Sequence, residues 1–213
     1  MDPIPASFPA ALPAAIAVTL AFLVTLRARP QLTRQASGKV LAFFALFGLP
    51  AVCLSLGLAQ HMEHAKKREF CLSCHVMEPY GNSLYVDDEE FVPAVHFQDR
   101  LVPRDKACYT CHTTYGPFGD ARAKLRGLRH LYVQYLGQVP DTIRLYEPFH
   151  NRECLHCHGG ARQYMEVEAH RDPDTLFASI AANRTSCLTS GCHDVGHNVS
   201  ELGEVTFWKE PRP

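Results

Sequence analysis

The chain has 213 residues, and its 21 basic and 22 acidic side chains leave a formal net charge of −1. That balance excludes a strongly basic nucleic-acid-binding protein on electrostatic grounds, so no nucleic-acid partner is expected. Nine residues are cysteine, which is too few for a small disulfide scaffold, and the odd number prevents complete internal pairing.

Two uncharged, apolar runs open the chain, at residues 8–26 and 40–59. A helix of about 20 apolar residues spans the roughly 30 Å hydrocarbon core of a bilayer. The first run contains Pro9 and Pro13, and a cleaved signal peptide is its alternative interpretation, although no basic residue precedes it. The sequence therefore predicts a membrane anchor over residues 1–59, with two transmembrane helices, and a polar domain over residues 60–213.

The charges predict how this anchor is oriented. Residues 27–39 carry four basic side chains and no acidic one, so the positive-inside rule places this loop in the cytoplasm. Residues 60–213 then lie on the periplasmic side of a bacterial inner membrane. The basic run at residues 66–68 favours the opposite orientation, so the prediction also depends on the chemistry of the cysteines.

Residues 71–75, 108–112 and 154–158 all have the pattern C-x-x-C-H. This is the attachment motif of haem c, in which two thiols form thioethers and the histidine is placed beneath the iron. Zinc ribbons need no histidine beside each cysteine pair and space the pairs about 15–20 residues apart, whereas 33 and 42 residues separate these. Residues 187–193 have the longer pattern C-x4-C-H, in which the two extra residues can loop out at Gly191.

Four covalently bound haem c groups are therefore expected. The predicted attachment residues are Cys71, Cys74, Cys108, Cys111, Cys154, Cys157, Cys187 and Cys192. A local disulfide, or two idle thiols in a three-haem protein, is the alternative at the fourth motif. Cys53 lies within the second apolar run and is expected to be an ordinary helix residue. Haem is attached outside the bacterial cytoplasm, which agrees with the orientation that the charges predict.

Residues 60–213 lack long periodic apolar runs, and we expect haem to replace a conventional core. The predicted fold class is mainly α, with a small, loop-rich multihaem domain and little or no β-sheet. One helix is predicted over residues 120–136, with Asp120 as its cap. Its apolar face and its basic residues fit either a solvated helix or one lying at the membrane surface beside a haem.

Residues 70–80 follow a hydrophobic anchor and resemble the NapC/NirT/NrfH family of membrane-anchored tetrahaem quinol dehydrogenases. The resemblance covers roughly residues 40–200, and Met77 stands at the family's methionine position two residues after the first motif. Departures include a second membrane helix and the longer fourth motif. Tyr115 also replaces a common histidine, and His130 and Gln134 replace an acidic residue and a histidine.

The resemblance implies a set of iron ligands. The motif histidines are His75, His112, His158 and His193, and the distal candidates are His96, His170 and His197, with His130 in reserve. Met77 is implied to replace His75 at the first haem, and the alternative is that Met77 only packs while His75 ligates. His156 is expected to be a bystander, and His61 and His64 to be interfacial polar residues.

The resemblance also implies oxidation of membrane quinol, with menaquinol expected, at the outer face of the bilayer. The electrons would pass along the haems to a periplasmic or membrane-bound redox protein, within a larger complex. The first motif follows the second apolar run by 12 residues, which reach about 40 Å at most, so the first haem is tethered near the membrane. Candidate groups of the quinol site are Lys124, Asp120 and His130.

Two other functions remain open. The chain could be a haem wire, an electron-transfer subunit without its own quinol site. A haem-based sensor or assembly anchor is disfavoured, because such a protein does not need four haems.

Overall fold

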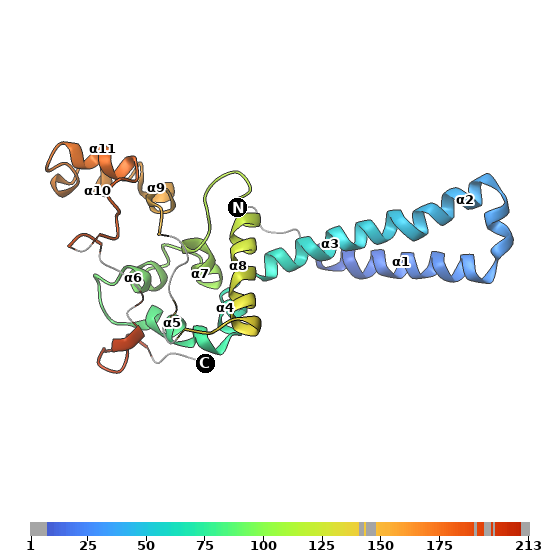
Figure 1. Ribbon diagram of the computed structural model, residues 1–213, viewed down its shortest axis with the longest axis horizontal. Helices are drawn as coiled ribbons and strands as arrows, with labels where there is room; N and C mark the ends of the chain where they lie inside the picture. The colour runs from blue at the N-terminus through green and yellow to red at the C-terminus, as the bar shows by residue number, and fades with distance from the viewer. Residues whose placement is uncertain are drawn as a thin grey trace. The chain divides into compact units, whose positions relative to one another are not determined.

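In the computed structural model, the chain forms two compact units, Met1–Ala65 and Lys66–Pro213 (Figure 1). The structure describes residues 8–140, 143, 148–189, 191–193, 197 and 199–209. Across these residues the fold is helical, and extended pairing is limited to one antiparallel bridge between Val86 and Phe207. The predicted mainly α fold is confirmed.

The first unit is a helical hairpin. Helix α1 (Phe8–Ala28) runs to a 3₁₀ turn (Pro30–Arg34), after which α2 (Ala36–Phe43), a π-helical turn (Phe44–Gly48) and α3 (Leu49–His64) form a continuous rod (Figure 1). The rod and α1 lie side by side. Two spans, Ala10–Ala28 and Ala36–His64, are long and apolar enough to cross a membrane.

The second span runs beyond the predicted limits of 40 and 59 at both ends. Pro50 has no N–H to donate to the carbonyl four residues earlier, and the π-helical turn directly before α3 accommodates that loss. Val24 is 66% and Leu54 74% exposed, as lipid-facing side chains would be. Cys53 is a helix residue whose Sγ lies 3.7 Å from the hydroxyl of Thr19 on α1.

The second unit consists of short helices joined by loops (Figure 1). They are α4 (Arg68–Leu72), α5 (Glu78–Asn82), α6 (Val92–Gln98), α7 (Ala107–Cys111), α8 (Gly119–Leu136), α9 (Asn151–His158), α10 (Arg162–Met165) and α11 (Thr175–Ala181). Its apolar core is a small cluster of buried side chains: Leu84, Phe97, Val102 and Ala107. So small a cluster fits a domain built around large prosthetic groups.

Helix α8 matches the predicted helix within one residue, but its start differs from the prediction. Asp120 is not the cap: Phe118, at a φ of 61°, precedes the helix, and Asp120 lies in its first turn. A Cβ on Gly119 would meet the carbonyl oxygen of Thr114 at 1.7 Å, so only glycine fits this close approach. The carboxylate of Asp120 is instead engaged by Lys66.

Candidate haem-binding site

Five of the six cysteines of the first three motifs lie on short helices: Cys71 on α4, Cys108 and Cys111 on α7, and Cys154 and Cys157 on α9. Cys74 lies just after α4, directly before the 3₁₀ turn that begins at His75. Residues three apart on a helix share a face, so the two thiols of α7, like those of α9, can reach one macrocycle.

The fourth motif lies in a turn region. There Gly191 has a φ of +83°, the left-handed conformation that glycine adopts without strain. The backbone therefore supplies the freedom that the longer spacing requires.

Four of the eight predicted attachment cysteines lie close together, in two pairs. Interaction with the thiol of Cys108 lowers the pKa of Cys71 to about 7. Interaction with the thiol of Cys154 likewise lowers the pKa of Cys187 to about 7. The first motif is thus adjacent to the second, and the third to the fourth.

Three motif histidines each face one of the distal candidates. The pairs, with distances between ring centroids, are His112 and His197 at 6.2 Å, His96 and His158 at 5.8 Å, and His170 and His193 at 6.2 Å. Two imidazoles that bind one metal ion from opposite sides have centroids roughly 6 Å apart, because each metal–nitrogen bond is about 2 Å long. These residues therefore fit haem iron with two axial nitrogens.

The distal candidates are oriented by hydrogen bonds at Nδ1. The partners are the carbonyl of Val92 for His96 at 2.8 Å, the carbonyl of Tyr164 for His170 at 3.0 Å, and the hydroxyl of Ser83 for His197 at 2.7 Å. A carbonyl only accepts, so Nδ1 of His96 and of His170 carries the proton. Their Nε2 atoms then keep the lone pair that binds a metal.

The surrounding protein keeps His112 and His197 neutral, although the side chain of His112 is solvent-exposed and that of His197 half-buried. Desolvation lowers the pKa of His197 to about 4 and also lowers the pKa of His112. Neutral imidazole is the form that binds a metal, so both rings are in the ligand state. His130 is exposed on α8, and His197, not this reserve candidate, faces His112.

The first motif has different surroundings. The side chain of His75 is 99% exposed, and its Nδ1 lies 3.3 Å from Glu78. Met77 is half-buried at the end of the same 3₁₀ turn (His75–Met77). Within the part of the chain that the structure describes, His75 faces no second imidazole.

His156, expected to be a bystander, stacks on Tyr115. The two ring centroids are 3.9 Å apart and the planes differ by 9°. The backbone N–H of Tyr115 also donates to the carboxylate of Glu153. This contact joins the loop after the second motif to the helix of the third motif.

Two of the predicted quinol-site residues belong to a polar cluster of Lys66, Tyr109, Asp120 and Lys124, here called the Asp120 cluster. Lys66 Nζ and the Tyr109 hydroxyl each donate to the Asp120 carboxylate at 2.6 Å. Lys124 Nζ lies 4.6 Å from the centroid of the Tyr109 ring. His130, the third candidate, lies ten positions after Asp120 on α8.

The charges of the cluster are fixed by its contacts. Burial by itself would raise the pKa of Asp120, but the hydrogen bonds from Lys66 and Tyr109 and the charge of Lys124 lower it overall. Burial and the hydrogen bond to Asp120 raise the pKa of Tyr109 to about 12. Asp120 is therefore an anion and Tyr109 a neutral donor near neutral pH.

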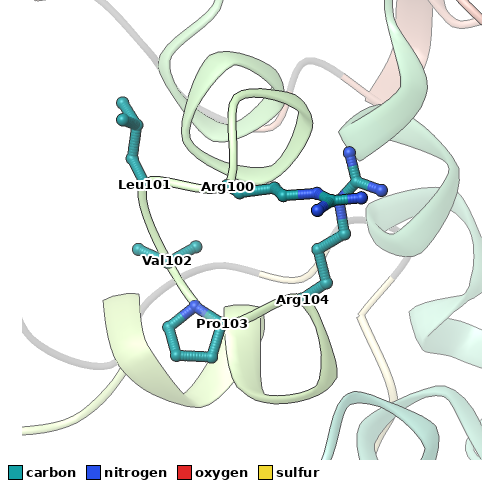
Figure 2. A pocket seen from close by; sticks show the side chains of 5 residues that line it. All are labelled: Arg100, Leu101, Val102, Pro103 and Arg104. Atoms are coloured by element: carbon teal, nitrogen blue, oxygen red, sulfur yellow. The ribbon is translucent and has the colours of Figure 1, made fainter.

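The loop after α6 supports His96, and its residues 100–104 line an open pocket of about 550 Å³ (Figure 2). The Val102 N–H donates to the His96 carbonyl at 3.2 Å. Arg104 Nε donates to the Phe97 carbonyl at 3.0 Å, and the guanidinium lies over the Phe97 ring. These contacts hold the end of α6 that carries His96.

Sequence reasoning missed Lys66 and Ser83. Lys66 belongs to the basic run that favoured the opposite orientation, and no motif marks it. Ser83 lies 114 positions from His197, the residue that it contacts, so no local pattern could reveal the pair.

The chain is similar in sequence to known c-type cytochromes. The model of the NapC/NirT cytochrome c family, N-terminal region, matches residues 33–202. The Escherichia coli K12 cytochrome c-type protein NapC is 26% identical over 166 residues, which cover 70% of this chain and 77% of that protein. The Haemophilus influenzae NapC is 23% identical over 189 residues, covering 81% and 86%.

The Escherichia coli K12 cytochrome c-type protein TorC is 33% identical over 79 residues, which cover 37% of this chain and 18% of that protein. No solved structure gives a significant match. The family match spans the second apolar helix and all four cysteine motifs. The chain therefore belongs to the NapC/NirT cytochrome c family, as a membrane-anchored multihaem c-type cytochrome that serves in electron transfer.

Proposed function

We propose that this protein binds four haem c groups, oxidises membrane quinol, and passes the electrons to a periplasmic redox partner. The observation that carries the proposal is the contrast between three histidine pairs at iron-ligand spacing and a first motif whose histidine faces no second imidazole in the described part of the chain. The paired motifs suit electron transfer, while the first motif suits contact with a substrate.

The eight predicted cysteines would hold the haems through thioethers. His112 with His197, His158 with His96, and His193 with His170 would bind three irons, and Met77 would bind the first. When bound, haem c supplies an iron that cycles between ferric and ferrous states and takes up one electron at a time.

Quinol loses two electrons and two protons when it becomes quinone, and the bound haems would supply the two one-electron acceptors that this oxidation needs. The two protons pass to water outside the membrane. Lys124 would stabilise the negative charge that develops on the quinol oxygen as its proton leaves.

Helix α8 supplies a surface suited to a lipid-soluble substrate. Its exposed apolar side chains include Leu125 at 67%, Leu128 at 57% and Tyr135 at 77%. Arg122 and Lys124 give the same helix a positive character. Such a helix binds the surface of an anionic bilayer, and we propose that α8 lies there and admits quinol.

Reduction of the purified protein in detergent by a menaquinol analogue tests the proposal. The wild-type haems should be reduced, and Lys124→Leu should slow that reduction about tenfold or more. Lys209→Leu is the matched control, because Lys209 also lies over an aromatic ring, that of Trp208, at 4.0 Å. Dithionite should reduce all three proteins equally.

The wire function makes the opposite prediction. If the wild-type protein accepts electrons from a soluble partner but never from the quinol analogue, it has no quinol site. The extra apolar helix at residues 8–26 favours neither function, because it can complete a quinone pocket or dock against another membrane subunit.

We also propose that the haem domain lies on the periplasmic side of the inner membrane and that residues 27–39 lie in the cytoplasm. Replacing the four basic residues of that loop should scramble insertion. Reporter fusions at residue 5 should be active only in a periplasmic assay, and cytoplasmic activity there would contradict the proposed orientation.

A further inference from the structure

We propose that Asn151 is a positioning residue of the fourth haem site, where it fixes the backbone of Cys187 so that a motif with two extra residues still binds haem. The inference rests on the proposed binding of four haem c groups, and it adds a residue that no cysteine motif contains. Asn151 is the first residue of α9, the helix of the third motif, and lies 36 positions before Cys187.

Asn151 is a buried amide whose side chain is hydrogen-bonded at both ends. The residue is 2% exposed. Its Nδ2 donates to the carbonyl of Ile180 at 2.8 Å and to that of Thr185 at 2.6 Å. Its Oδ1 accepts the backbone N–H of Cys187 at 2.9 Å. The amide is held in one orientation, because turning it over would leave buried donors and acceptors unpaired.

The backbone of Cys187 is also fixed on its carbonyl side. This carbonyl accepts the N–H of His193, the histidine of the same motif, at 3.1 Å. In the second motif the carbonyl of Cys108 accepts the N–H of His112 at 2.9 Å, the bond of an ordinary α-helical turn. The two ends of the fourth motif are therefore joined by the same kind of bond, although two more residues lie between them.

The fourth motif does not fix its first cysteine by local structure. In the second and third motifs both cysteines lie on one short helix, so the local backbone sets the distance between the thiols. The described residues of the fourth motif form turns and bends, and Gly191 has a φ of +83°. The position of Cys187 therefore depends on a contact from outside the motif, which Asn151 supplies.

The same contact joins the fourth motif to the third. Asn151 and Cys154 are three residues apart on α9 and hence share a face of that helix. The thiol of Cys154 interacts with that of Cys187. One helix thus carries an attachment residue of the third haem and positions an attachment residue of the fourth.

The test is the number of haems on the denatured chain, measured by mass, and the peptide that carries each haem. Asn151→Ala leaves the Cys187 N–H and two buried carbonyls without this partner, so the share of chains with a fourth haem should fall about fivefold or more. The missing haem should be the one on the peptide that contains Cys187.

Asn183→Gly is the matched control. Asn183 accepts the backbone N–H of Asn151 at 2.8 Å, so this variant removes a hydrogen bond to the same residue without changing the contact with Cys187. Glycine also tolerates the φ of 57° at this position. Asn183→Gly should therefore keep four haems.

A shortened motif tests whether Asn151 acts on the motif itself. Deleting Leu188 and Thr189 restores the C-x-x-C-H spacing, in which the local backbone sets the distance between the thiols. The deletion alone should keep four haems, and combined with Asn151→Ala it should restore the fourth haem to most chains. A residue needed only for the stability of the domain would not be bypassed in this way.

Amide hydrogen exchange in the wild-type haem protein tests the contact without any substitution. The Cys187 amide should exchange slowly, because it donates to a buried oxygen. In Asn151→Ala chains that retain four haems, this amide should exchange about fivefold faster or more, while the His112 amide is unchanged. Rapid exchange at Cys187 in the wild type would contradict the contact and overturn the inference.

The outcomes separate two failures. If the wild type and Asn151→Ala both carry four haems, only the role of Asn151 is wrong. If Asn183→Gly also loses the fourth haem, or the deletion does not restore it, Asn151 acts through the fold and the inference is overturned. If the wild type carries three haems and none at Cys187, the proposed four-haem function fails, and the role of Asn151 fails with it.

Discussion

The first haem motif and the other three place their histidines in different surroundings. His112, His158 and His193 each face a second imidazole, with ring centroids 5.8 to 6.2 Å apart, whereas His75 faces none among the residues that the structure describes. A histidine fixed opposite a second imidazole suits an iron that only changes its charge. An iron not enclosed in this way can lie close to a substrate. The difference separates the three motifs with paired imidazoles, which suit electron transfer, from the first motif. We propose that electrons enter at the first motif.

The largest expected effect is the loss of a whole haem. Changing Cys187 and Cys192 together to alanine should lower the haem count from four to three, as measured by the mass of the denatured chain. Cys53→Ala should retain four, because that residue lies in the membrane helix. A wild-type mass that corresponds to three haems would mean that the fourth motif binds no haem.

The next effect concerns the paired motifs. His197→Ala should convert one of the four haems from low to high spin, because it removes a strong axial nitrogen. Absorption and electron paramagnetic resonance spectra would show the change. His156→Ala should leave the spectra unaltered, since that ring stacks on Tyr115. Unaltered spectra in both variants would contradict the histidine pairing.

A smaller effect addresses the first motif. Met77→His should lower the reduction potential of one haem, because a thioether ligand raises the potential relative to imidazole. Spectroelectrochemical titration would resolve this shift, and the other three potentials should stay in place. If Met77→Leu leaves all four potentials unchanged, His75 is the ligand and the first motif resembles the others.

The smallest effect is expected at Ser83. Ser83→Ala removes the hydrogen bond to Nδ1 of His197, which makes the imidazole a weaker electron donor. The potential of the second haem should rise slightly while its iron stays low-spin. Ser55→Ala, in the membrane helix, is the control. A high-spin signal in Ser83→Ala would mean that the hydroxyl is needed to keep the imidazole in place.

Local patterns were enough for several features. The two apolar runs became the helical hairpin, since a span of apolar residues needs no distant partner to be recognised. The period of α8 predicted its length within one residue. The C-x-x-C-H spacing marked the candidate attachment cysteines and motif histidines, because the whole pattern lies within five consecutive residues.

Other features depend on packing between distant segments. The sequence supplied His96, His170 and His197 as candidates, but their partners at the second, third and fourth motifs became clear only from the fold. The sequence predicted Asp120 as the helix cap because it is an acidic residue at the start of the predicted helix, residues 120–136. In the structure, Gly119 packs closely against Thr114 and the helix begins at Gly119, one residue earlier than predicted. The carboxylate of Asp120 therefore accepts a hydrogen bond from Lys66.

By itself, then, the sequence determined the membrane anchor, the helical class and the haem chemistry, because each is written in a few neighbouring residues. Only the tertiary structure decided which imidazoles face each other and which cation holds Asp120. Those contacts join residues up to 85 positions apart, as in His112 and His197, and their distances depend on how every intervening segment packs.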